Sequence, residues 1–162
     1  MEIRKTGLED MDAAMAIYAA ARAFMADSGN PHQWTNGYPS RETVLGDIET
    51  GKSHVCVEGD EVLGVFYFAQ EDEPVYHRIL EGAWLDDGPY GVVHRIAVAG
   101  PGKGIVSFCL GWCLDRCGSL RIDTHRDNAP MRKALLKNGF HYCGLVYYGE
   151  TEERLAFQRL RS

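Results

Sequence analysis

Three glycines spaced two apart interrupt the middle of the chain. The segment HRIAVAGPGKGIVSF, residues 94–108, passes from an apolar run into Gly100, Gly102 and Gly104 and then into a second apolar run. A turn that leads into a helix leaves backbone N–H groups without partners at the positive end of the helix dipole. Glycine lets a ligand oxygen approach such amides closely. The pattern favours an anion site, most simply for phosphate, although a tight connection without any ligand has the same composition.

The kinds of phosphate site can be narrowed from the same segment. No G-K-S/T sequence follows the glycines, which argues against a P-loop nucleotide hydrolase, and the spacing G-x-G-x-x-G is not met cleanly. The strand, turn and helix also come in mid-chain, after a predicted hairpin, which is the wrong place for a dinucleotide-binding fold.

A second repeated spacing belongs to cysteine. Cys109, Cys113 and Cys117 recur every four residues in a chain with five cysteines. One interpretation is a thiolate metal site on one helix face, and the other is a row of small apolar side chains in a core. There is no C-x-x-C pair and no histidine at ligand spacing, so we expect core packing and no metal.

Composition limits the class of protein. The 162 residues are 45% apolar and 25% charged, which suits one globular domain spanning 1–162. The net charge of −6 argues against general binding to nucleic acid or anionic membranes. No apolar run reaches the roughly 18 residues of a membrane span, and the first ten residues do not read as a signal peptide, so we expect a cytoplasmic protein.

The spacing of apolar residues, together with the glycines, prolines and capping residues between the apolar segments, predicts a mixture of helices and strands in an α/β (or α+β) domain. Thr6 and Glu9 read as a capping box for the first helix, Ser40 as the cap of the second, and Gly59-Asp60 as a hairpin turn. A β-α-β unit over 91–125 should join parallel strands. The predicted helices are 7–27, 40–51, 103–117 and 128–138, and the predicted strands are two within 53–70, then 91–98, 119–125, 140–148 and 154–160.

This order of elements resembles the GNAT superfamily of acetyl-CoA-dependent N-acetyltransferases, and in particular a bacterial subgroup. The residues that carry the resemblance are IAV (96–98), GKGI (102–105) and the pattern N-x-x-M…K-N-G-F over 128–140. The resemblance covers nearly the whole chain. It implies a mixed, mostly antiparallel sheet of six to seven strands with about four flanking helices, in which strands 4 and 5 splay apart in a V.

The resemblance also implies acetyl-CoA as cofactor, with no metal. In the family, amides of the glycine turn grip the pyrophosphate, the pantetheine arm lies in the splay, and an asparagine with its helix lines the other side. Carried over to this chain, the cofactor-binding residues are Ile96, Ala97, Val98, Pro101, Gly102, Lys103, Gly104, Ile105, Val106, Asn128 and Met131.

The chain departs from the family pattern at three positions. Pro101 stands where an arginine is common, Val106 replaces a small residue, and Leu135 stands where a tyrosine often protonates the departing thiolate. Amide binding of phosphate survives these changes, whereas the usual thiolate acid is missing.

An amine acceptor must lose a proton before it attacks a thioester, so the site needs a base. His94, on the predicted strand with Val92 and Ile96, is our candidate, because imidazole titrates near neutral pH. Serotonin N-acetyltransferases are similar in carrying a histidine at the matching place. The alternative is a histidine buried in the sheet. Asp123 and His125 on the adjacent strand could orient His94 or act as the base themselves.

Aromatic residues from two irregular segments could wall the acceptor, since the family borders its substrate there. They are Trp34 and Tyr38 in the loop after the first helix and Trp84 before the central strand, and His125 completes the predicted substrate set. Core packing is the alternative for the aromatic residues. Trp112, in mid-helix, fits core packing or a contact between two copies in a homodimer.

These observations lead to one preferred function and two alternatives. The preferred one is transfer of an acetyl group from acetyl-CoA to a primary amine of a small molecule or peptide, by direct attack in a ternary complex. A non-catalytic coenzyme A-binding sensor or scaffold with this fold is the alternative. Acetylation of RNA-linked aminoacyl groups is a third, and the acidic net charge argues against it.

Overall fold

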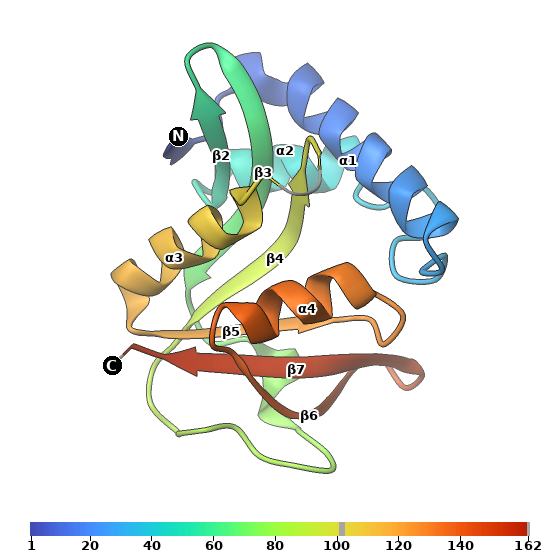
Figure 1. Ribbon diagram of the computed structural model, residues 1–162, viewed down its shortest axis with the longest axis vertical. Helices are drawn as coiled ribbons and strands as arrows, with labels where there is room; N and C mark the ends of the chain where they lie inside the picture. Colours follow the sequence, from blue (N-terminus) through green and yellow to red (C-terminus); the bar gives the residue numbers. More distant parts are fainter. Residues whose placement is uncertain (101–102, 162) are drawn as a thin grey trace.

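The chain is built on one seven-stranded sheet. The computed structural model describes residues 1–100 and 103–161, and the strands lie in the order β1-β2-β3-β4-β5-β7-β6 (Figure 1). All neighbours are antiparallel except β4 and β5, which are parallel. The strands are β1 (Glu2–Lys5), β2 (Ser53–Glu58), β3 (Glu61–Gln70), β4 (Gly91–Val98), β5 (Ser119–Thr124), β6 (His141–Tyr148) and β7 (Glu152–Leu160).

Helices cover both faces of this sheet. α1 (Met11–Asp27) and α2 (Arg41–Glu49) pack on one face through a core that contains Val55, Val65 and Ala97. α3 (Ile105–Cys117) and α4 (Ala129–Lys137) cover the other face over a larger core. Two short 3-10 turns, Leu8–Asp10 and Pro74–His77, complete the elements. The predicted mixed sheet of six to seven strands with four helices is confirmed.

The N-terminus differs from the prediction. Residues 2–5 form the edge strand β1, and α1 begins at Met11 instead of residue 7. The Thr6–Glu9 capping box is wrong, because the Thr6 hydroxyl bonds the Ser53 hydroxyl at 2.8 Å and the Gly7 N–H donates to Asp10 at 2.7 Å. The short strand has a single inward apolar residue, too little to signal a strand.

β4 and β5 separate soon after they begin. Their register contains only the pairs Gly91–Leu120 and Val92–Arg121, although β4 continues to Val98 and β5 to Thr124. The paired end of the two strands packs closely at Gly91, where a Cβ would lie only 2.8 Å from the Phe68 ring. The predicted V-shaped splay between the fourth and fifth strands is therefore confirmed.

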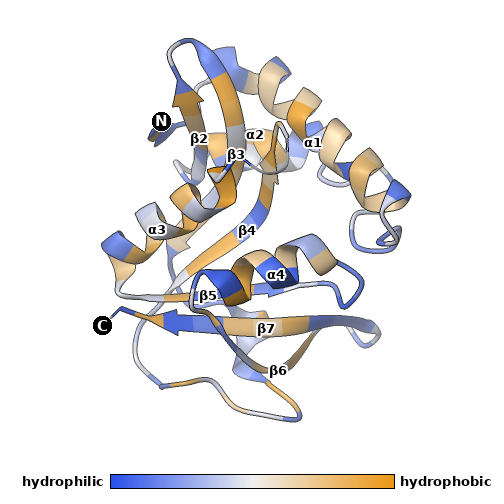
Figure 2. Cartoon of the chain, in the orientation of Figure 1, coloured by the Kyte–Doolittle hydropathy of each residue, from blue (hydrophilic) through white to orange (hydrophobic). Residues whose placement is uncertain are grey.

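A bulge shifts the faces of β4 at Arg95. Its φ is +50°, a left-handed conformation that is uncommon for arginine, and the β3–β4 register shifts between Val65 and Tyr67. As a result Ile96 packs in the α3-side core with Val93, whereas His94 lies on the opposite face beside Tyr67. The prediction that His94 and Ile96 share a face is wrong for this reason. Figure 2 shows hydrophilic residues in the middle of β4, between hydrophobic ones on either side.

The cysteines are packing residues of the core. Cys109 and Cys113 are fully buried, all five thiols are free, and burial raises the pKa of both Cys109 and Cys113. Within residues 1–100 and 103–161, no group of three or more His, Cys, Asp and Glu side chains could hold a metal ion. Trp112 is partly buried against His54 and Phe68.

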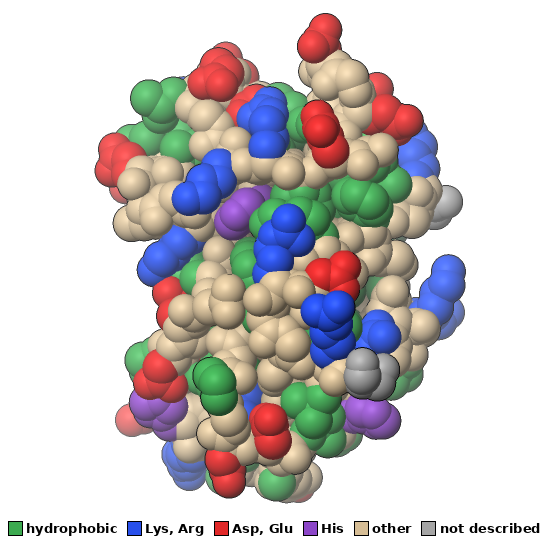
Figure 3. Space-filling view, turned by 90° about the vertical axis from the view of Figure 1, so that its left-hand side faces the viewer, with side chains coloured by type: hydrophobic (Ala, Val, Ile, Leu, Met, Phe, Trp, Pro, Cys, Tyr) green, Lys and Arg blue, Asp and Glu red, His purple; other side chains and the backbone are tan. Residues whose placement is uncertain are grey.

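No described helix is long and apolar enough to cross a membrane. Figure 3 shows one face of the molecule, on which acidic and basic side chains are interspersed with small apolar areas.

Candidate functional site

Two cavities meet where β4 and β5 diverge. The first, of about 710 Å³, lies between the middle of β4, the end of β5 and the loop between α1 and α2. The second, of about 510 Å³, runs from the end of β4 along the starts of α3 and α4. Met25, Ile96, Asn128 and Met131 line both cavities, so the two cavities adjoin at the splay.

The second cavity has the features of a phosphate site. The first hydrogen bond of α3 runs from the Phe108 N–H to the Gly104 carbonyl, and the preceding amides of Ile105–Ser107 have no acceptor inside the helix. Gly104 has φ +70° with open space around it, and Lys103 and Lys137 add positive charge at the wall. A pyrophosphate fits this helix start and its basic wall.

The predicted cofactor residues gather around this cavity. Ile96, Ala97, Val98, Lys103, Gly104, Ile105, Val106, Asn128 and Met131 all line it. Pro101 and Gly102 lie outside the described residues. Leu135, at the position of the family's tyrosine, is fully buried in the α3-side core.

His94 lies in the first cavity, paired with a carboxylate that the sequence did not single out. Its Nε2 is 3.0 Å from Glu73 Oε2, and the two side chains are only 15% and 16% exposed. The bond from His94 is the largest cause of a lowered pKa for Glu73. Because a carboxylate only accepts, the imidazole carries its proton on Nε2 and Nδ1 is the acceptor atom when the ring is neutral.

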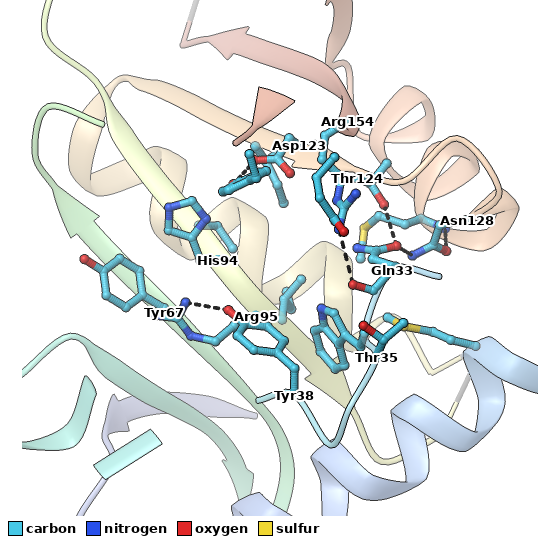
Figure 4. Close-up of a pocket in the computed structure, with 18 of the residues that line it drawn as sticks. Gln33, Thr35, Tyr38, Tyr67, His94, Arg95, Asp123, Thr124, Asn128 and Arg154 are labelled. Atoms are coloured by element: carbon cyan, nitrogen blue, oxygen red, sulfur yellow. Dashed lines mark hydrogen bonds and ion pairs between the residues drawn. The ribbon is translucent and has the colours of Figure 1, made fainter. Parts of the chain in front are cut away.

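Asp123 lies on the other side of the same cavity, on β5 (Figure 4). Its Oδ2 accepts hydrogen bonds from Tyr76 and Tyr148, both at 2.6 Å. Glu73, not Asp123, is therefore the carboxylate bonded to His94, since the splay separates β4 from β5. Burial and the nearby Asp123 carboxylate raise the pKa of Tyr148, whose hydroxyl already donates to Asp123.

Arg95 fixes a second group of side chains around the cavity. Its Nε and Nη2 donate to the two oxygens of Asp47 on α2, both at 2.9 Å, and its Nη1 donates to the Tyr38 hydroxyl at 3.0 Å. The guanidinium also lies 4.8 Å from the centre of the Tyr67 ring. The bulge therefore turns Arg95 toward α2, where Asp47 neutralises its charge. The same guanidinium holds Tyr38 at the cavity wall.

Of the predicted substrate residues, two line the first cavity and two do not. Trp34 and Tyr38 line it, with Trp34 also packed on the core. The Trp84 ring packs on Tyr76, and its indole donates to the Tyr76 carbonyl at 2.9 Å. The His125 Nδ1 accepts from the Asp127 N–H at 3.0 Å. Trp84 and His125 therefore stabilise the loop before β4 and the turn before α4, and neither lines a cavity described here.

Among the polar lining residues that were missed from the sequence are Glu73, Gln33 and Arg154. Glu73 comes from the acidic segment after β3, which reads as a solvated surface. Gln33 lies among Gly, Pro and Asn residues, which predicted a loop but gave no indication of a site. Arg154 pairs with Glu152 at 3.2 Å within β7 and donates to the Gln33 carbonyl, and this second contact depends on the tertiary fold.

Known structures share this architecture, although no family model and no curated protein matches the chain. A GNAT-family acetyltransferase from Streptococcus agalactiae is 32% identical, with a TM-score of 0.91 over 99% of this chain and 95% of that chain. One from Bacillus cereus is 17% identical, with a TM-score of 0.66 over 99% and 97%. An N-acetyltransferase from Staphylococcus aureus is 22% identical, with a TM-score of 0.66 over 98% and 97%. Because the chain is 32% identical to the Streptococcus agalactiae protein over nearly its whole length and has a splayed sheet, it belongs to the GNAT family of acetyltransferases.

Proposed function

We propose that this protein transfers an acetyl group from acetyl-CoA to a primary amine of a small molecule or peptide, by direct attack in a ternary complex. The observation that carries the proposal is that the two cavities adjoin and share four lining residues. A helix start suited to pyrophosphate lies in one cavity, and the adjoining cavity at the β4–β5 splay holds a histidine paired with a carboxylate. When bound, acetyl-CoA supplies the activated thioester.

His94 is the base of this proposal. Nδ1 takes the proton of the amine, directly or through one water, and Glu73 stabilises the charge that forms on the ring. The same carboxylate fixes the tautomer and the direction of the imidazole, as in other histidine–carboxylate pairs. Backbone N–H groups of the splayed part of β4, around Ile96, can polarise the carbonyl that is attacked.

The charges of the first cavity favour a cationic acceptor. Both arginines that line it are neutralised, Arg95 by Asp47 and Arg154 by Glu152. Asp123 is held by two tyrosine hydroxyls at one oxygen, and in the described chain its Oδ1 has no hydrogen-bond donor. We therefore propose that Asp123 receives the ammonium group before His94 removes the proton, and that an acceptor with a carboxylate next to its amine is disfavoured.

Initial-rate kinetics test the direct attack. Acetyl-CoA and a reactive amine are varied together, and thiol release is followed. A ternary complex predicts intersecting double-reciprocal lines. Parallel lines, with acetyl retained on the protein when the amine is omitted, would indicate a covalent intermediate and overturn the mechanism.

A further inference from the structure

Three side-chain amides form a chain where the α1–α2 loop crosses the end of β5. Asn30 and Gln33 come from the loop, and Asn128 begins α4. We infer that Asn30 is a cofactor-binding residue whose side-chain oxygen accepts an N–H from the pantetheine arm of coenzyme A. The inference rests on the proposed function for the identity of the cofactor.

Backbone contacts fix the direction of Asn128 first. The Met131 N–H donates to Asn128 Oδ1 at 3.1 Å, as in an ordinary helix cap. The amide nitrogen of Asn128 must then point the other way, and it lies 3.0 Å from Gln33 Oε1. The placement of oxygen and nitrogen in Asn128 is thus determined by the α4 backbone.

Gln33 is determined in turn. Its Oε1 faces the Asn128 nitrogen and the His125 backbone N–H at 3.4 Å, with the Thr124 hydroxyl at 3.5 Å. A backbone N–H can only donate, so the atom of Gln33 at this place is the oxygen. Asn30 therefore offers its Nδ2 to the same oxygen, at 2.9 Å. Figure 4 shows Gln33 between Thr124 and Asn128.

This leaves the oxygen of Asn30 without a donor. Asn30 is 3% exposed, and within the described residues its Oδ1 is buried with no hydrogen-bond partner. The residue lines the second cavity. A buried acceptor without a donor is unfavourable, so a ligand that brings an N–H to this atom gains free energy.

The chemistry of the atom selects the part of the cofactor. A pyrophosphate and a thioester carbonyl can only accept at neutral pH, so neither suits Asn30 Oδ1. The donors of coenzyme A are the adenine amino group and the ribose hydroxyl at the nucleotide end, and one hydroxyl and two secondary amide N–H groups on the pantetheine arm. Asn30 lines the second cavity and is bonded through Gln33 to Asn128, which lines both cavities, so it lies beside the path from the α3 amides to the first cavity. From this position we assign the donor to the pantetheine arm, as one of its two amide N–H groups, and a donor at the nucleotide end would weaken the bisphosphate as well.

Calorimetry with two ligands tests the inference without any acetyl transfer. Coenzyme A and adenosine 3′,5′-bisphosphate, which lacks the pantetheine arm, are titrated into the parent protein and Asn30→Ala. We expect about a three- to tenfold weaker Kd for coenzyme A in the variant and an unchanged Kd for the bisphosphate. Equal losses for both ligands, or no loss for coenzyme A, would overturn it.

Gln33→Ala is the matched control, since it removes the centre of the amide chain but keeps Asn30. If Asn30 acted only by holding Gln33, the two variants would weaken coenzyme A equally, and that result would also overturn the inference. We expect the larger loss in Asn30→Ala.

A measurement on the parent protein guards against a misfolded variant. In ¹⁵N spectra, the Asn30 side-chain amide should shift on addition of coenzyme A and stay in place with the bisphosphate. An unmoved resonance on coenzyme A binding would contradict the contact. A parent protein that binds no coenzyme A would overturn the proposed function as well, whereas loss of the Asn30 effect alone leaves that function standing.

Discussion

His94→Gln removes the proposed base and keeps a side chain that can reach Glu73. General-base assistance contributes about 10²- to 10⁴-fold to a rate, or about 2.7–5.4 kcal/mol at about 1.36 kcal/mol per tenfold change. The cavity of about 710 Å³ exceeds by far the roughly 30 Å³ that one water occupies in the liquid, so water can assist in the variant. We therefore expect the lower end, a loss of about 100-fold in kcat/KM.

The assay is thiol release from acetyl-CoA with a saturating amine across a range of pH. The acid limb of the pH–rate profile should move or vanish in His94→Gln, while the Kd for coenzyme A stays nearly unchanged. Glu73→Gln keeps a hydrogen-bond acceptor but loses the charge, so we expect a smaller loss of about tenfold.

A surface pair supplies the control for this experiment. His77 and Asp72 form a second histidine–carboxylate contact, at 2.7 Å, with both side chains more than half exposed and neither lining a described cavity. His77→Gln should leave kcat/KM unchanged. A folded His94→Gln protein with the parental kcat/KM and the same acid limb would refute the role of His94 and transfer it to Asp123 or an ordered water.

Three further outcomes follow from the geometry. Gly104→Asp places a carboxylate at the start of α3 and should weaken coenzyme A binding at least about tenfold in calorimetry. Gly118→Asp is the control, because Gly118 has a similar φ of +71° at the far end of α3 and its substitution should leave the Kd unchanged. Equal Kd values for the two variants would place the phosphate site elsewhere. Burial lowers the pKa of His54 below 6.5, so the unfolded chain takes up the proton first and stability is lost as pH falls below about 6.5. His54→Phe should therefore reduce the drop in Tm between about pH 7.5 and about pH 5.5. An identical drop in the variant and the parent protein would contradict this. Gly91→Ala puts a Cβ 2.8 Å from the Phe68 ring and should cost about 1–3 kcal/mol of unfolding free energy in urea titrations; an unchanged midpoint would show that the closed end of the splay can relax.

Elements with strong local signals were predictable from the sequence. Ser40 caps α2, where it accepts from the Thr43 N–H at 3.1 Å, and the Gly59-Asp60 turn joins β2 to β3. The edge strand β1 was missed because it has four residues and one inward side chain, Ile3, so its existence depends on pairing with β2.

The candidate site was predictable where one segment carries it and not where distant segments meet. The glycine turn is local, so its spacing indicated an anion site, whereas the set of cofactor-binding residues came from the family resemblance. The partner of His94 is Glu73, brought in from the segment after β3 by the turn at Pro74–His77. Strict alternation along β4 gave the wrong face for Ile96, because the bulge at Arg95 depends on pairing with β3 and on Asp47.

The aromatic residues show the same limit. Trp34 and Trp84 lie in similar irregular segments, and nothing local distinguishes them. The difference is tertiary, since Trp34 borders the splay whereas Trp84 stacks on Tyr76 and, at 4.3 Å, on Arg121. An aromatic residue in a loop therefore indicates packing or a substrate wall equally, until the sheet is known.

We propose that the two adjoining cavities together support acetyl transfer to an amine. The most direct measurement is thiol release from acetyl-CoA in the presence of a panel of amines, with the product identified by mass spectrometry. We expect thiol release that depends on the amine, an acetylated amine as product, and a preference for cationic amines without a neighbouring carboxylate. Binding of coenzyme A with no amine-dependent thiol release across the panel would contradict it and leave a coenzyme A-binding protein without catalysis.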